Sequence, residues 1–295
     1  MASSSGGFDG QSILNHVTDF RYKDYSDKAE SVSLYDFPII GNTESIWYID
    51  FSITKHVLML WIVAAFTIAI SVYATRAYRK NKNAKPKGIA HLFEILMEFI
   101  KSDIVIPNIG KKGYHTWAPL ITTFFSFILV SNFIGMIPFF ELIPAVYGSS
   151  TITGNFALTL ALSVITFFAI IVAGTMKHGF IGHWKNLIPG GVPAPVLIIL
   201  IPIEIVGMII KPLALTLRLG ANMTAGHIGV VAIFGIPMII YQSVGSVGVG
   251  LSVGVVSVIL NTAIYFLEFI VCFVQAYVFS LLSSVFIGMA IHADH

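Results

Sequence analysis

The chain has 295 residues, of which 56% are hydrophobic and only 11% are charged, whereas about a quarter of an average soluble domain is charged. This composition excludes an ordinary soluble enzyme or binding domain. The net charge of +2 indicates no particular partner, and the single cysteine, Cys272, cannot form a disulfide within the chain. We therefore expect an all-α integral membrane protein.

The N-terminal 52 residues are predicted to form a polar arm outside the membrane. Residues 1–50 hold eight Asp or Glu and three Lys or Arg. The first fifteen residues have neither a basic start nor an apolar centre. We therefore expect no cleaved signal peptide.

Five segments are predicted to cross the bilayer, because each reaches or approaches the ~20 apolar residues that span a hydrocarbon core. They cover residues 55–78, 116–140, 155–176, 196–234 and 238–291, with breaks expected at 188–195 and at Gly235 and Pro237. Six Lys or Arg lie between residues 76 and 87, and none between 141 and 155. The positive-inside rule then places the N-terminus outside and the C-terminus in the cytoplasm.

A separate amphipathic helix is predicted over residues 88–104. Apolar side chains recur there at helical spacing, opposite His91, Glu94, Glu98 and Lys101. Such a helix is typical of a segment that lies on the membrane surface, here the cytoplasmic one.

Formal charges are scarce in the last two long segments. Between residues 188 and 291 the only charged residues are Glu204, Lys211, Arg218 and Glu268. A charge at bilayer depth costs about 2.5–3.5 kcal/mol even on the lenient insertion scale, so such residues usually line a pathway or pair with one another. The first three are spaced by seven residues, nearly two helical turns, and therefore form one stripe.

Titratable and amide side chains extend this pattern. Asn222 continues the stripe beyond Arg218, whereas His227 falls about half a turn away from Arg218, on the opposite face. A second stripe with the same spacing holds Asn261, Glu268 and Gln275. If His227 and Glu268 lie side by side, they form a proton-accepting pair, because an imidazole and a carboxylate shift each other's titration.

Arg218 cannot relay a proton, because its guanidinium stays charged at physiological pH. In a proton path its value is electrostatic, since it can attract a carboxylate on a moving partner and block leakage between two aqueous channels. The alternative interpretation is a structural ion pair, or a side chain that reaches back to the membrane surface.

These residues resemble a known family. The segment KPLALTLRLGANMTAGH (211–227), the pair Glu268 and Gln275, and SNFIGMIP (131–138) are similar to subunit a of F-type rotary ATP synthases. The likeness in hydropathy runs from about residue 50 to the end. The sequence departs from the family at LRLGANM, where many members have an aromatic residue, and this departure concerns local packing only.

The resemblance implies a non-catalytic stator subunit in which residues 53–295 form a proton-channel domain. Its last two long helices would lie tilted along a ring of c subunits, with peripheral-stalk b subunits as further partners. Arg218 would separate two half-channels, with His227 and Glu268 paired in the outer one and Asn222 and Gln275 as polar neighbours of the arginine. Further candidates for the proton path are Glu204, Lys211, Asn261 and Asn132. Candidates for the cytoplasmic exit are His91, Glu94, Glu98 and Asn132.

No cofactor, metal or nucleic acid is expected. The long polar arm favours a bacterial inner membrane over that of a mitochondrion or chloroplast. A sodium-coupled version of the same subunit stays open, because ion choice would reside mainly in the ring. Two other classes are an independent secondary transporter, which predicts inverted repeats that we do not find, and a structural docking protein, in which lysine could replace Arg218.

Overall fold

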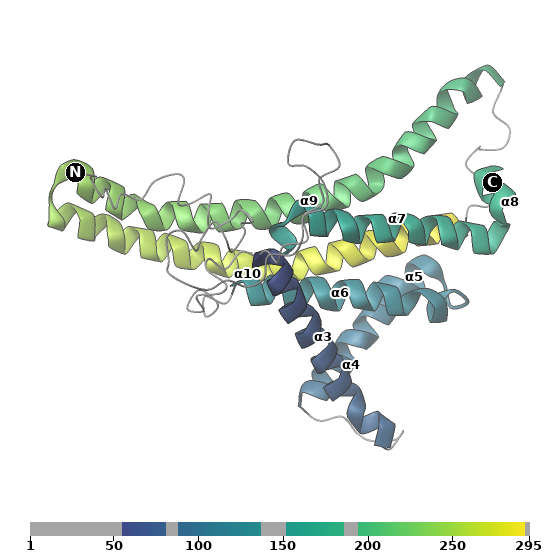
Figure 1. The fold of residues 1–295 in the computed structure, drawn as a ribbon, viewed down its shortest axis with the longest axis horizontal. Helices are drawn as coiled ribbons and strands as arrows, with labels where there is room; N and C mark the ends of the chain where they lie inside the picture. Colours follow the sequence, from purple (N-terminus) through teal and green to yellow (C-terminus); the bar gives the residue numbers. More distant parts are fainter. Residues whose placement is uncertain (1–54, 81–87, 137–151, 186–193, 293–295) are drawn as a thin grey trace, which may run out of the picture. The chain divides into compact units, whose positions relative to one another are not determined.

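The structure is a computed structural model that describes residues 55–80, 88–136, 152–185 and 194–292. The predicted N-terminal arm, the last three residues, and most of the 141–155 and 188–195 segments lie outside the described residues. The elements within these ranges are α3 (Lys55–Lys80), α4 (Ile89–Phe99), the π-helical η1 (Ile100–Val105), α5 (Ile106–Ile109), α6 (Tyr114–Met136), the 3-10 turn η4 (Ile152–Gly154), α7 (Phe156–His178), α8 (Phe180–Lys185), α9 (Ala194–Val244) and α10 (Val247–Ile291) (Figure 1).

The expected all-helical architecture with two long C-terminal helices is confirmed. Five of the described helices are long and apolar enough to cross a membrane, namely α3, α6, α7, α9 and α10. Their apolar stretches carry few charges, and many of their large apolar side chains are exposed. A bilayer provides the apolar surroundings that such surfaces require.

The expected break at Gly235 and Pro237 is wrong. Helix α9 continues through both residues to Val244, and the chain reverses at Gly245, whose φ of 68° lies in the left-handed region. A proline inside a membrane helix is tolerated because neighbouring groups and local adjustments satisfy the backbone carbonyl that it leaves unpaired. Glycine with positive φ is a common helix terminator, so the stop signal lies ten residues beyond Gly235.

The predicted amphipathic helix begins where expected, but from Ile100 onward it forms a π-helix and not an α-helix. Helix α4 passes into η1 at Ile100, and the π-helical turn alters the spacing of the faces. Ile89, Leu92 and Ile95 of α4 are exposed, whereas Ile100 and Ile104 are buried. The segment thus has an exposed apolar side, and its location at a cytoplasmic surface stays a prediction.

The described chain divides into two compact units, which we describe separately. Unit 1 comprises residues 55–64, 131–136, 152–155 and 222–271, and unit 2 comprises residues 65–80, 88–130, 156–185, 194–221 and 272–292. Both long helices contribute to both units, because the division falls after Ala221 in α9 and after Val271 in α10.

Unit 2 is held together by aromatic and hydroxyl contacts. Phe99 of α4 lies 6.3 Å from Phe125 of α6 and 5.8 Å from Tyr277 of α10, measured between ring centroids. The hydroxyls of Thr166 in α7 and Ser283 in α10 are buried and 3.3 Å apart. Aromatic rings fill large volumes and small hydroxyl residues allow close helix packing, which is how membrane helices associate.

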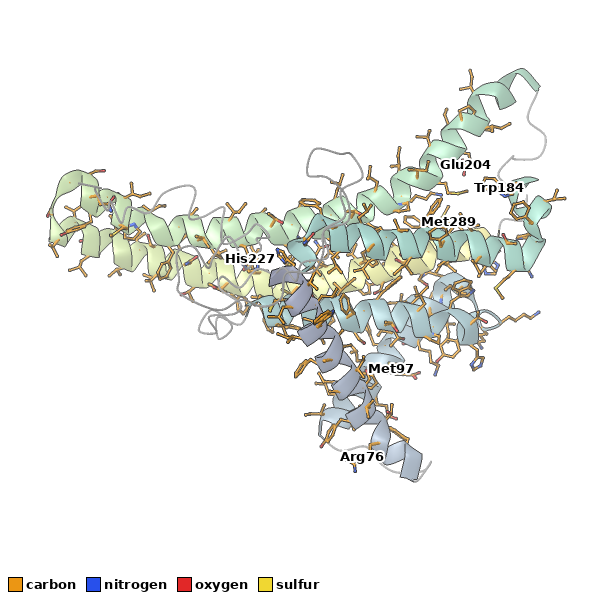
Figure 2. All side chains as sticks on the ribbon, viewed as in Figure 1. Arg76, Met97, Trp184, Glu204, His227 and Met289 are labelled. Atoms are coloured by element: carbon orange, nitrogen blue, oxygen red, sulfur yellow. The ribbon has the colours of Figure 1, made fainter. Side chains whose placement is uncertain are left out.

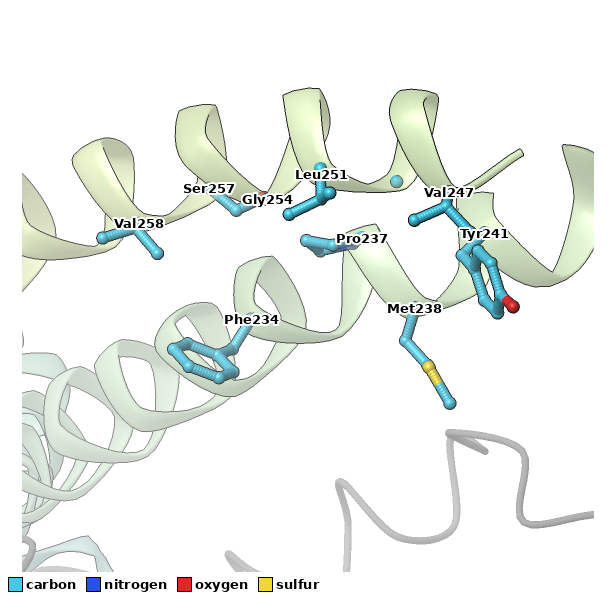
Figure 3. A pocket seen from close by; sticks show the side chains of 10 residues that line it. Phe234, Pro237, Met238, Tyr241, Val247, Leu251, Gly254, Ser257 and Val258 are labelled. Atoms are coloured by element: carbon cyan, nitrogen blue, oxygen red, sulfur yellow. The ribbon is translucent and has the colours of Figure 1, made fainter. Parts of the chain in front are cut away.

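Unit 1 contains the turn between the two long helices and an open groove beside it. The end of α9 and the start of α10 lie side by side there (Figure 3). A Cβ on Gly250 would touch the Tyr241 side chain, so the two helices approach closely at this point. The groove has a volume of about 420 Å³, and apolar residues such as Phe234, Met238 and Leu251 line it. This end of the helix pair therefore presents a hollow apolar surface.

Candidate functional site

Arg218 projects from the exposed face of α9 in unit 2. Its neighbours Leu215 and Leu219 are buried, whereas Leu217 is 51% exposed and Arg218 is exposed as well. The ion pairs among the described residues of unit 2 are His91–Glu94 and Lys101–Glu98, so no carboxylate of this unit neutralises the guanidinium. Within its own unit, Arg218 is thus a permanent charge on an exposed helix face.

The other charged residues of the first stripe differ from Arg218 in their surroundings. Lys211 is half-buried, and its ammonium lies 5.7 Å from the ring centroid of Phe286 on α10. This is a cation–π contact, and it anchors Lys211 within unit 2. Glu204 is exposed on the N-terminal part of α9 (Figure 2).

In unit 1, Glu268 lies beside the turn of α9 that carries His227. A carboxylate oxygen of Glu268 contacts the position that a Cβ would take on Gly226, so the two helices meet at this point. Glu268 and His227 are both half-buried, and Figure 2 labels His227. The structure therefore brings the predicted carboxylate to the residue that immediately precedes the predicted imidazole.

Asn261 and Gln275, which flank Glu268 by seven residues along α10, are both buried. The Oδ1 atom of Asn261 has no hydrogen-bond partner among the described residues. A buried polar atom left unsatisfied costs about 1–3 kcal/mol, and water commonly supplies the missing bond. Asn261 thus places a polar atom without a partner among the described residues on the helix face that also carries Glu268. Asn222 is exposed on α9.

Asn132 takes part in a buried hydrogen bond that joins α6 to η4. The hydroxyl of Thr153 donates to its side-chain carbonyl at 2.6 Å. From the other side, the hydroxyl of Thr224 on α9 donates to the backbone carbonyl of Gly154 at 3.1 Å. The short turn η4 is therefore fixed between α6 and α9, and its anchor on α9 lies two residues before Gly226.

The exit candidates on α4 are surface groups. His91, Glu94 and Glu98 are all exposed. Glu98 accepts hydrogen bonds from the Lys101 ammonium, and this contact raises the pKa of Lys101 above its usual value. No three His, Cys, Asp or Glu side chains gather at one place in the described ranges, so we identify no metal site there.

The pattern of residues did not reveal Gly226, Thr153 or Thr224 as part of this region. The partner hydroxyl of Asn132 lies 21 residues away across residues 137–151. A glycine directly before His227 was the one visible signal, because glycine in a helix often marks a close approach.

Comparisons with known proteins agree with one another. Residues 57–288 match the family described as ATP synthase A chain. The chain is 41% identical to ATP synthase subunit a of Chloroherpeton thalassium over 248 residues, which cover 83% of this chain and 69% of the relative. It is 39% identical to ATP synthase subunit a 2 of Chlorobaculum tepidum, and the match covers 97% of this chain and 74% of the relative. ATP synthase subunit a of Anaeromyxobacter dehalogenans is 33% identical, and the match covers 99% of this chain and 74% of the relative.

Proposed function

The chain belongs to the family of ATP synthase subunit a, and we propose that its Arg218 separates two half-channels that lead protons to and from a ring of c subunits. The family is that of the proton-translocating stator in the membrane sector. Its members are membrane subunits that carry out no bond chemistry themselves. The proposal therefore assigns individual residues of this chain to steps of proton transport.

The exposure of Arg218 is the observation that carries the proposal. A cation at membrane depth needs a counter-charge, and no carboxylate of its own unit pairs with it among the described residues. A carboxylate on a neighbouring ring meets this need each time it arrives deprotonated. The guanidinium then holds the deprotonated carboxylate, and because it is itself permanently protonated it cannot relay a proton directly from one channel to the other.

His227 and Glu268 supply the proton-accepting groups of the outer half-channel. Glu268 packs against Gly226, and His227 is the next residue in the chain. The unsatisfied amide oxygen of Asn261 favours water on the same face of α10. An aqueous path then leads a proton to a carboxylate and an imidazole, each of which can accept it.

The lengths of α9 and α10 support a tilted arrangement along the ring. Helix α9 has 51 residues and is about 75 Å long. A hydrocarbon core is only about 30 Å thick, and apolar helices that exceed this thickness tilt. Strongly tilted helices present a long face to a curved neighbour, which places Arg218 and its neighbours against successive ring subunits.

The ring of c subunits and the peripheral-stalk b subunits are the partners that the family implies. We place the chain in a bacterial inner membrane, in line with the bacterial sources of its relatives. The excess of Lys and Arg between residues 76 and 87 supports an external N-terminus and a cytoplasmic C-terminus.

ATP-driven proton pumping in inverted membrane vesicles tests the proposal. We expect Arg218→Ala to reduce pumping to background while the complex remains assembled. Lys177→Ala is the matched control, because Lys177 is an exposed cation at the end of α7. Native pumping by an assembled Arg218→Ala complex would refute the role of the arginine.

A further inference from the structure

A pocket of about 270 Å³ lies between α4–η1 and the N-terminal end of α6, entirely within unit 2. One part of its wall is apolar and consists of Met97, Ala118 and Pro119. The remaining lining residues, Lys101, Tyr114, His115 and Thr122, have side chains that can donate hydrogen bonds. A pocket with one apolar and one polar wall suits an amphiphile better than a fully soluble molecule.

The sequence beside the pocket has the composition that is typical of the boundary between a membrane and water. Helix α6 begins at Tyr114, and the apolar stretch that could cross the bilayer begins at the same residue. Two exposed lysines, Lys111 and Lys112, precede Tyr114 and are separated from it by Gly113. Tyrosine and lysine are typical of this boundary, where the tyrosine ring reaches the headgroups and the lysine reaches water.

Charges around the pocket favour an anion. Lys101 donates to both oxygens of Glu98, at 3.1 and 3.0 Å, which holds the ammonium in place and leaves one of its three N–H donors. Residues 97–122, the span that contains all the lining residues, hold two negative charges on Glu98 and Asp103 and three positive ones on Lys101, Lys111 and Lys112, so the sum over this span is +1. The N-terminal end of α6 adds the partial positive charge of a helix start.

We propose that this pocket binds an anionic phospholipid such as phosphatidylglycerol. Its phosphate lies among Lys101, Tyr114 and the Lys111–Lys112 pair, and the upper part of an acyl chain lies on Met97, Ala118 and Pro119. Basic pockets between helices at a membrane surface bind lipid headgroups in this way. Free phosphate satisfies only the polar wall, so the apolar wall favours the lipid.

Photolabelling of the whole complex tests this site. The assembled complex is reconstituted with phosphatidylglycerol or phosphatidylcholine that carries a photoreactive group near the ester of one acyl chain. After irradiation, peptide mass spectrometry measures the label on residues 97–122. We expect phosphatidylglycerol to label this segment several-fold more than phosphatidylcholine.

Variants and competition separate the possible outcomes. The double variant Lys111→Gln/Lys112→Gln should reduce phosphatidylglycerol labelling to the phosphatidylcholine level, whereas Lys177→Gln, at the exposed end of α7, should leave it unchanged. Equal labelling by the two lipids, or native labelling in the double variant, would overturn the proposal. Suppression of the label by millimolar inorganic phosphate would instead indicate a site for free phosphate and would also overturn the lipid assignment.

Discussion

The carboxylate of Glu268 on α10 lies against Gly226 on α9, at a point where a Cβ atom on residue 226 would collide with it. The absence of a side chain at Gly226 is therefore what allows the carboxylate to reach the turn that carries His227. The position of the Glu268 carboxylate thus depends on Gly226, a residue without a side chain.

Gly226→Ala should impair proton transport without harming the fold. Alanine is favoured over glycine in a helix by about 1 kcal/mol, but its methyl group takes the place of the Glu268 carboxylate. We expect reduced pumping by a normally assembled complex. The control is Gly229→Ala, one turn further on, because a Cβ there meets no atom within 4 Å. Equal pumping rates in the two variants would contradict this role of Gly226.

Exchange of the two titratable groups tests whether they act as a pair. The single variants His227→Glu and Glu268→His each leave two like groups, and we expect both to lose most ATP-driven pumping. The double variant His227→Glu/Glu268→His restores one carboxylate and one imidazole across the same helix contact. It should recover a substantial part of the pumping. If the double variant is no better than the single ones, the residues do not function as a pair.

Thr153→Val should destabilise unit 1. This change removes the hydroxyl that donates to the buried Asn132 side chain, and loss of one partner of a buried hydrogen bond costs about 1–3 kcal/mol. We expect a lower temperature of thermal disassembly for the purified complex. The control is Thr123→Val. It removes an exposed hydroxyl that donates to a carbonyl of its own helix, so the temperature of thermal disassembly should hardly change. Equal temperatures for Thr153→Val and the native complex would contradict the structural role.

Local pattern was sufficient to predict the five long helices, because they depend on composition and on helical periodicity. The end of α9 was missed because Pro237, which normally ends a helix in water, is accommodated within a long apolar helix. The real end at Gly245 depends on a positive φ, which a sequence does not display.

The site was only partly predictable for a different reason. The residue types and spacing of Arg218, His227 and Glu268 stand out against an apolar background, whereas Gly226 and Thr224 are ordinary membrane-helix residues. Their importance arises from contacts between segments far apart in the chain, such as the bond from Thr224 to Gly154.

Arg218→Lys distinguishes an arginine that gates proton transfer from one that merely docks a neighbour. Lysine keeps the positive charge, but it lacks the planar fork of donors and can lose its proton when desolvated. ATP-driven pumping and passive proton flux are measured in vesicles that carry the assembled complex. We predict that Arg218→Lys loses coupled pumping, as Arg218→Ala does. Native coupling in Arg218→Lys would contradict the gating role and would favour docking instead.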